Sequence, residues 1–172
     1  MNTEKTLFST LNVLIFLIML AIGFGLIFSI LSMTGVIGVT PSITINGHEI
    51  GHNDLTVAHY IFMGLNLIFY VVFIFGLFKL RVVAKLILQN DIYNPSLSIN
   101  SELAGKDFVL TGTFWWLFDG LSNLHFNNKL SIVVSDKTFV YLFIICIGLF
   151  LMLTSKLITN AIQLKAENDL TI

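Results

Sequence analysis

Four long apolar stretches constrain this chain more than any other feature of its sequence. They cover roughly residues 7–33, 57–80, 108–124 and 139–159. A helix of about 20 apolar residues crosses the roughly 30 Å hydrocarbon core of a bilayer. Backbone amides in lipid must find hydrogen-bond partners within their own segment, so each span is expected to be helical. The sequence therefore predicts an all-α membrane protein, with residues 1–172 forming a single four-span domain.

Composition supports this class and argues against others. Hydrophobic residues make up 56% of the chain and charged residues 11%, which is far from the balance of a soluble domain. The formal net charge is −1, without a basic stripe of the kind that binds nucleic acid directly. The lipid bilayer is thus the first partner that the sequence predicts.

The distribution of Lys and Arg predicts the orientation in the membrane. Four spans place the N-terminus, the segment between the second and third spans, and the C-terminus on one side. Of the nine Lys and Arg residues, only Lys129 and Lys137 fall on the other side. The remaining seven are Lys5, Lys79, Arg81, Lys85, Lys106, Lys156 and Lys165. Because cytoplasmic loops are enriched in Lys and Arg, we expect a multi-pass inner (cell) membrane protein with both termini in the cytoplasm.

The spans pair as two helical hairpins, and the segments on the outer side have strand-like patterns. Asn46-Gly47 lies between alternating residues from Pro41 to Ile50, a strong signal for a β-hairpin. A second strand-like run covers residues 130–134. We therefore expect a small β-rich cap on the outer face.

On the cytoplasmic side, the second helix is expected to continue past Leu80. Arg81 and Lys85 are four residues apart, so they share a helix face that can meet anionic lipid headgroups. The helix should stop before Pro95, because the residue preceding a proline disfavours helix. Asn100 or Ser101 is the expected cap of the third helix.

Asp119 is the most informative single polar residue of the apolar stretches. A carboxylate at the centre of a span costs about 2.5–3.5 kcal/mol, so Asp119 must face protein or water or be protonated. The second span offers His59 and Asn66 on one helix face. We hypothesise that Asp119 hydrogen-bonds to Asn66, His59 or both, as a structural contact or as a proton- or ion-handling group. The second alternative would suit a small oligomeric transporter or channel.

The segment from His48 to His52 matches the zinc-protease pattern H-E-x-x-H, in which two histidines bind the metal and Glu49 would be the base. His59 follows seven residues later and could be a third ligand. The pattern works only on a helix, whereas Asn46-Gly47 predicts a hairpin here. A membrane zinc hydrolase, a non-catalytic zinc site and an ordinary polar loop therefore remain open. Our first expectation is a protein without catalytic residues or a cofactor.

Small residues recur every four positions in the first span, at Ala21, Gly25 and Ser29. Such a stripe lets two helices approach closely. It fits packing within one chain or a homo-oligomer.

Two segments resemble a known family. The segment Ile92-Tyr93-Asn94-Pro95 and the ending from Gln163 to Ile172 are similar to those of the bacterial four-span membrane proteins catalogued as domain of unknown function 2975. The resemblance implies no established activity. Members are often encoded beside helix-turn-helix regulators, which implies a structural or regulatory role as the membrane partner of a cytoplasmic protein. The contact would then be made by Lys165, Glu167, Asp169 and Leu170. The alternative is that this tail is simply a solvated end.

Overall fold

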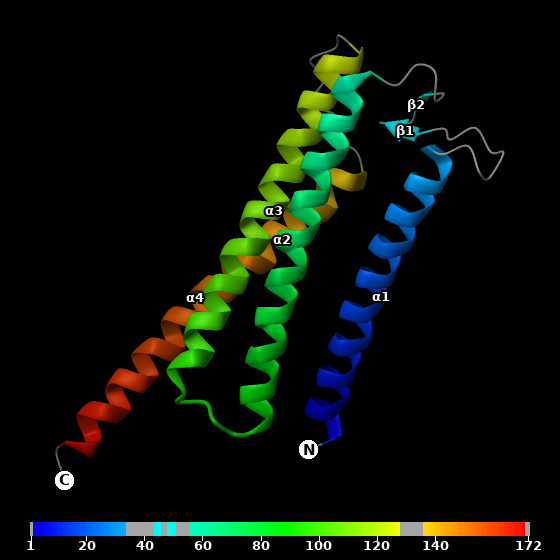
Figure 1. Ribbon diagram of the computed structural model, residues 1–172. Helices are drawn as coiled ribbons and strands as arrows, with labels where there is room; N and C mark the ends of the chain where they lie inside the picture. The colour runs from blue at the N-terminus through cyan, green and yellow to red at the C-terminus, as the bar shows by residue number, and fades with distance from the viewer. Residues whose placement is uncertain (1, 34–42, 46–47, 51–55, 128–135, 171–172) are drawn as a thin grey trace.

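The computed structural model describes residues 2–33, 43–45, 48–50, 56–127 and 136–170, and these form four long helices and one short hairpin (Figure 1). The elements in chain order are α1 (Asn2–Met33), β1 (Ile43–Ile45), β2 (His48–Ile50), α2 (Val57–Leu88), α3 (Pro95–Asn127) and α4 (Asp136–Asp169).

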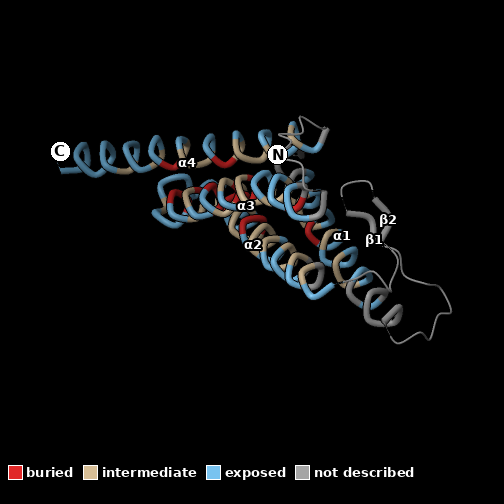
Figure 2. The backbone as a smooth tube through the Cα atoms, turned by 90° about the horizontal axis from the view of Figure 1, so that it is seen from above, coloured by how far each residue is buried: buried red, intermediate tan, exposed pale blue. Residues whose placement is uncertain are grey.

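Helix α3 lies at the centre of the arrangement. It packs against α2 on one side and α4 on the other, and α1 packs against α2. The N-terminus, the C-terminus and the segment joining α2 to α3 all lie at one end of the molecule (Figure 1). Buried residues are concentrated where α2, α3 and α4 face one another, whereas the last turns of α4 are exposed (Figure 2).

The apolar core includes side chains from all four helices. Ile15 of α1, Leu77 of α2 and Phe108 of α3 form a buried cluster. Other apolar side chains that pack against this cluster are Leu11, Ile18, Phe73, Phe78, Leu80, Ile144, Ile147 and Leu151. A Cβ atom placed on Gly76 would lie 2.7 Å from Cε1 of Phe108, so glycine at this position allows the Phe108 ring to fill the space between α2 and α3.

Helices α3 and α4 approach closely because each carries glycine at the contact. A Cβ atom on Gly105 would lie 2.5 Å from the backbone oxygen of Gly148, and a Cβ atom on Gly148 would lie 2.7 Å from that of Gly105. Two turns further along α3, Gly112 makes a similar contact: a Cβ atom on Gly112 would lie 3.0 Å from the backbone oxygen of Tyr141. Small residues at a helix contact permit this kind of backbone proximity in membranes.

Three of the described helices are long and apolar enough to cross a membrane, which supports the predicted class. The qualifying segments are Phe8–Gly25 in α1, Gly64–Leu88 in α2 and Lys137–Asp169 in α4. Helix α3 is more polar, but several of its polar side chains face the neighbouring helices. Ser98, Ser101, Thr111 and Ser122 of α3 are all buried.

The fold class is all-α, and the predicted β-rich outer cap is not supported. Strands β1 and β2 are each three residues long and pair only with each other among the described residues, in the antiparallel register Ile43 to Ile50 and Ile45 to His48. A two-stranded hairpin of this length is too small to be a sheet layer. The strand-like run at residues 130–134 lies outside the described residues.

Our prediction for the start of the third helix was wrong. Helix α3 begins at Pro95, and the side-chain oxygen of Asn94 accepts a hydrogen bond from the Ser96 backbone N–H at 2.9 Å. Asn94 is thus the N-cap, and Pro95 occupies the first helical position, where its missing N–H costs nothing. Asn100, one of the expected caps, lies inside the helix, where its amide donates to the Ser96 carbonyl at 2.8 Å.

Candidate functional site

The polar side chains of α3 meet the adjacent helices at three levels along its length. One level lies near its first turns, one near its middle, and one in its last third. The contacts at each level join α3 to α2 or α4, so together they are the strongest candidate for a site within the bundle.

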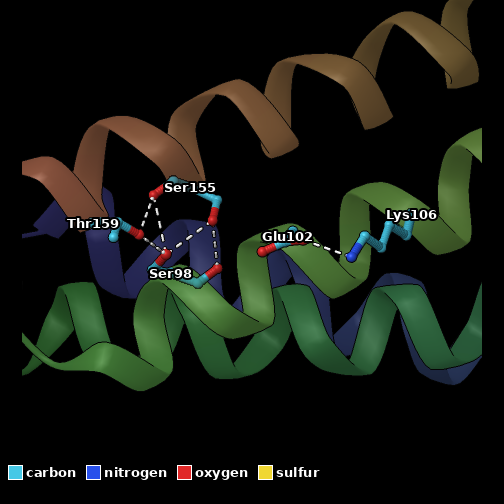
Figure 3. Close-up of polar contacts among 5 residues, drawn as sticks. All are labelled: Ser98, Glu102, Lys106, Ser155 and Thr159. Atoms are coloured by element: carbon cyan, nitrogen blue, oxygen red, sulfur yellow. Dashed lines mark hydrogen bonds and ion pairs between the residues drawn. The ribbon is translucent and has the colours of Figure 1, made fainter.

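The first level is a cluster of three hydroxyl groups between α3 and α4 (Figure 3). The Ser98 hydroxyl lies 2.9 Å from that of Ser155 and 2.6 Å from that of Thr159. Ser155 also donates to the Ser98 carbonyl at 2.9 Å, and Thr159 donates to the Ser155 carbonyl at 3.0 Å. Each of the three hydroxyl protons therefore has an acceptor within this hydroxyl cluster. The cluster thus holds α3 and α4 together and has a structural role.

One turn away on α3, Glu102 and Lys106 form an exposed ion pair (Figure 3). The Lys106 ammonium lies 2.6 Å from the Glu102 carboxylate. The pKa of Glu102 is held below its usual range, mainly by the hydrogen bond from Lys106 and secondly by the positive charge of Lys106. Both side chains are about half exposed, so solvent screens the pair and it contributes little to stability.

The second level is an ion pair between α2 and α3. Lys79 Nζ donates to Asp107 Oδ2 at 2.6 Å, and the two side chains are only 28% and 18% exposed. Lys79 lies within the apolar segment of α2, where an unpaired charge is expensive. From the sequence, Lys79 was expected only as a flanking cation. The difference from Arg81 and Lys85 is burial, because the Lys79 and Asp107 side chains are mostly covered and a buried charge needs a partner of opposite sign.

The third level contains the residues predicted to form an intramembrane polar cluster, but they have different partners. Asp119 accepts a hydrogen bond from the Tyr141 hydroxyl of α4 at 2.9 Å. Asn66 accepts one from the Trp115 indole N–H at 3.0 Å. Among the described side chains no hydrogen bond joins Asp119 to Asn66, and the side chain of His59 lies outside them.

Aromatic rings connect these two hydrogen bonds. The Trp115 ring lies 6.2 Å from the Tyr141 ring, centroid to centroid, and 4.9 Å from the Tyr70 ring. Asn66, Trp115, Tyr141 and Asp119 thus form one continuous set of contacts through α2, α3 and α4. Trp and Tyr suit this role because each combines an apolar body with a polar hydrogen-bonding group.

The H-E-x-x-H segment does not lie on a helix where the structure describes it. His48 and Glu49 are in strand β2, not on a helix. His52 lies outside the described residues. No group of three or more His, Cys, Asp or Glu that could hold a metal occurs within the described ranges.

The four predicted tail residues lie at the end of α4 and just beyond it. Lys165 Nζ lies 4.2 Å from the ring centroid of Tyr93, which belongs to the segment between α2 and α3. Glu167 and Asp169 are exposed, and Leu170 is 87% exposed. The tail therefore contacts the segment between α2 and α3 at the end of the molecule where both termini lie.

These observations define a helical bundle with three helices that can cross a membrane, in which polar contacts join α3 to α2 and to α4. Residues 43–172 match the family described as "Protein of unknown function (DUF2975)", and the chain belongs to this family. The resemblance seen in the sequence is confirmed. The match begins at β1 and does not include α1. No curated protein and no solved structure matches the chain.

Proposed function

We propose that this chain is a four-span inner-membrane protein with both termini in the cytoplasm, and that it acts without catalysis as a structural or regulatory component. The position of both termini and the α2–α3 segment at one end supports this topology (Figure 1). Seven of the nine Lys and Arg residues belong to that end or to the adjoining helix turns, as expected for a cytoplasmic side.

The surroundings of α3 support its role as the fourth span. Its buried polar side chains need not face lipid, because α2 and α4 cover them on two sides. Asp107 and Asp119 each have a partner from a neighbouring helix, which lowers the cost of placing carboxylates in a bilayer. A helix in this central position can be less apolar than the helices that face lipid.

The observation that carries the proposal is the length of α4, which exceeds what is needed to cross a bilayer. At a rise of 1.5 Å per residue the 34-residue helix is about 51 Å long, whereas the hydrocarbon core is roughly 30 Å thick. The last turns of α4 are polar and exposed. The apolar side chain of Leu170, which follows them, is also 87% exposed. Ile92 and Tyr93 in the α2–α3 segment are also exposed. These apolar side chains on an aqueous face favour a protein contact.

We therefore propose that Lys165, Glu167, Asp169 and Leu170, together with Tyr93, bind a cytoplasmic regulatory protein. The Lys165–Tyr93 contact supports a single surface made by the tail and the α2–α3 segment. A helix-turn-helix regulator is the partner class that the family resemblance favours.

Site-specific photo-crosslinking in intact cells tests this proposal. A crosslinking side chain at position 170 or 93 should yield one protein adduct of the same mass from both positions. The matched control is Leu157, which is exposed on the apolar part of the same helix and should crosslink only to lipid. Absence of a shared protein adduct at positions 170 and 93 would contradict the proposed contact.

A second candidate function is proton or ion transport, and the Tyr141–Asp119 hydrogen bond is the observation that favours it. A carboxylate with a titratable neighbour inside a bundle resembles the elements of proton relays. The test is proton flux in proteoliposomes, where an Asp119→Asn variant should lose a flux that the unaltered chain shows. An unaltered chain without flux would exclude this function.

We do not propose a hydrolase, because the H-E-x-x-H residues His48 and Glu49 lie in a strand. The test is the metal content of the purified protein. One zinc per chain that is lost in a His48→Ala/His52→Ala variant would restore the zinc alternative.

A further inference from the structure

The cations near the cytoplasmic end of α2 and α3 fall into two groups. Lys79 and Lys106 are each 2.6 Å from a carboxylate oxygen, on Asp107 and Glu102 respectively. Arg81 and Lys85 are exposed, and no carboxylate among the described side chains lies within ion-pair distance of either. The positive charge of these two residues is therefore available to an external anion.

Arg81 and Lys85 lie one helix turn apart at the edge between α1 and α2. The Arg81 guanidinium carbon lies 5.7 Å from the centroid of the Phe8 ring of α1. This cation–π contact restricts the position of the guanidinium without neutralising it. Residues four apart on a helix are neighbours on its surface, so one anion can contact both side chains.

An apolar stripe on α2 leads directly to this basic pair. Every seventh residue is a large exposed hydrophobe, namely Ile61, Ile68, Phe75 and Val82. Lys85 follows Val82 by three residues, so it lies on the same side of the helix, one turn nearer to its end. A molecule with an anionic head and long apolar chains matches both parts of this surface.

We propose that Arg81 and Lys85 bind the phosphate of an anionic phospholipid, with its acyl chains lying along the part of the stripe from Phe75 to Val82, which one leaflet covers. Guanidinium groups bind phosphate through paired hydrogen bonds, and the Lys85 ammonium adds a second charge on the same face. The proposal depends on insertion of α2 into the membrane. It does not depend on the proposed protein contact of the tail, which involves other residues.

The test is a titration of the purified full-length protein in detergent with phosphatidylglycerol or phosphatidylcholine, read by native mass spectrometry. The Arg81→Gln/Lys85→Gln variant should bind phosphatidylglycerol about 25-fold more weakly, because each cation contributes about fivefold. Its binding of phosphatidylcholine should not change.

The matched control is Lys106→Gln/Lys156→Gln, which removes the same number of charges from exposed positions on α3 and α4. It should bind phosphatidylglycerol within about twofold of the unaltered chain. Equal loss in the two double variants would overturn the proposal, as would equal binding of the two lipids by the unaltered chain.

Two further measurements test whether the site binds a lipid or a soluble phosphate compound, and whether binding depends on charge. Glycerol phosphate, which lacks acyl chains, should not displace the lipid, and full displacement would assign the site to soluble phosphate compounds instead. The charge-conserving variant Arg81→Lys/Lys85→Arg should keep its preference for phosphatidylglycerol. If the glutamine variant fails to fold, increasing salt must weaken phosphatidylglycerol binding by the unaltered chain, and salt-independent binding would overturn the proposal.

Discussion

The interface between α3 and α4 differs from that between α1 and α2 in how closely the helices approach. Gly105 and Gly148 bring the backbones of α3 and α4 together, and the hydroxyl cluster fastens them. Helix α1 meets α2 through apolar side chains around Ile15 and Leu77 and through the Arg81–Phe8 contact. Close packing and buried hydrogen bonds associate helices in lipid, where the hydrophobic effect between spans is absent.

Helices α2, α3 and α4 are therefore the firmly joined part of this bundle. The family match agrees with this division, because it includes β1 to α4 and leaves out α1. The following substitutions, given in decreasing order of their cost in stability, test whether the two interfaces differ in this way.

The largest effect is expected from Gly148→Val. An added Cβ would lie 2.7 Å from the Gly105 oxygen and 2.9 Å from the Val109 backbone nitrogen, and backbone atoms cannot move aside easily. We expect a loss of about 3 kcal/mol in the free energy of unfolding, measured by titration with a denaturing detergent. The control is Gly23→Val on α1, where an added Cβ meets nothing within 4 Å. Equal losses in the two variants would remove the contrast between the interfaces.

A smaller effect is expected when the Lys79–Asp107 pair loses one partner. Lys79→Met leaves the Asp107 carboxylate mostly buried without its cation, which should cost about 2 kcal/mol after allowance for partial exposure. The double variant Lys79→Met/Asp107→Leu should recover much of that loss, because no charge then remains uncompensated. Additive losses in a double-mutant cycle would show that the two residues are not coupled.

The hydroxyl cluster is expected to contribute less than the ion pair. Ser155→Ala removes a donor to the Ser98 carbonyl and an acceptor beside the Ser98 hydroxyl, at a cost of about 1 kcal/mol. Thr154→Ala is the neighbouring control, since within the described residues its hydroxyl donates to the Phe150 carbonyl of its own helix and not to α3. A larger loss for Thr154→Ala than for Ser155→Ala would contradict the role of the cluster.

The smallest effect is expected at the α1–α2 interface. Phe8→Leu keeps an apolar side chain but removes the ring beneath Arg81, which should cost about 0.5 kcal/mol. The same denaturing titration measures it, with Phe16→Leu on an exposed part of α1 as the control. A loss of unfolding free energy as large as that caused by Gly148→Val would show that α1 is held as firmly as α4, contrary to this prediction.

Much of the fold could be predicted because long apolar runs specify helices by length alone. The extent of α3 could not, since its first turns from Pro95 are polar and were assigned to the connecting segment. They are helical because Asn94 caps the helix and Pro95 occupies its first position. In addition, Leu97 and Ser101 are buried. The sequence does contain this start signal, an Asn directly before a Pro. It was not recognised because the Pro was taken only as the end of the preceding helix and not as the first residue of the next one.

The partners of the candidate site residues could not be predicted, for a different reason. Asp119 and Asn66 were expected to pair because both are polar residues in apolar helices. In the structure Tyr141 and Trp115 supply the donors. Which of several donors reaches a carboxylate depends on the rotation and register of neighbouring helices, and here glycine contacts such as Gly112 with Tyr141 set the register.

Side-specific labelling of single cysteines in intact cells, with the native Cys146 replaced by Ser, tests the four-span topology directly. A membrane-impermeant reagent should label Thr56→Cys directly, and should label Tyr93→Cys and Gln163→Cys only after the membrane is permeabilised. Since α4 is long and apolar enough to cross the membrane, this result would show that α3 crosses it as well and that α4 returns the tail to the side of the α2–α3 segment. Labelling of Gln163→Cys but not Tyr93→Cys in intact cells would contradict the four-span account.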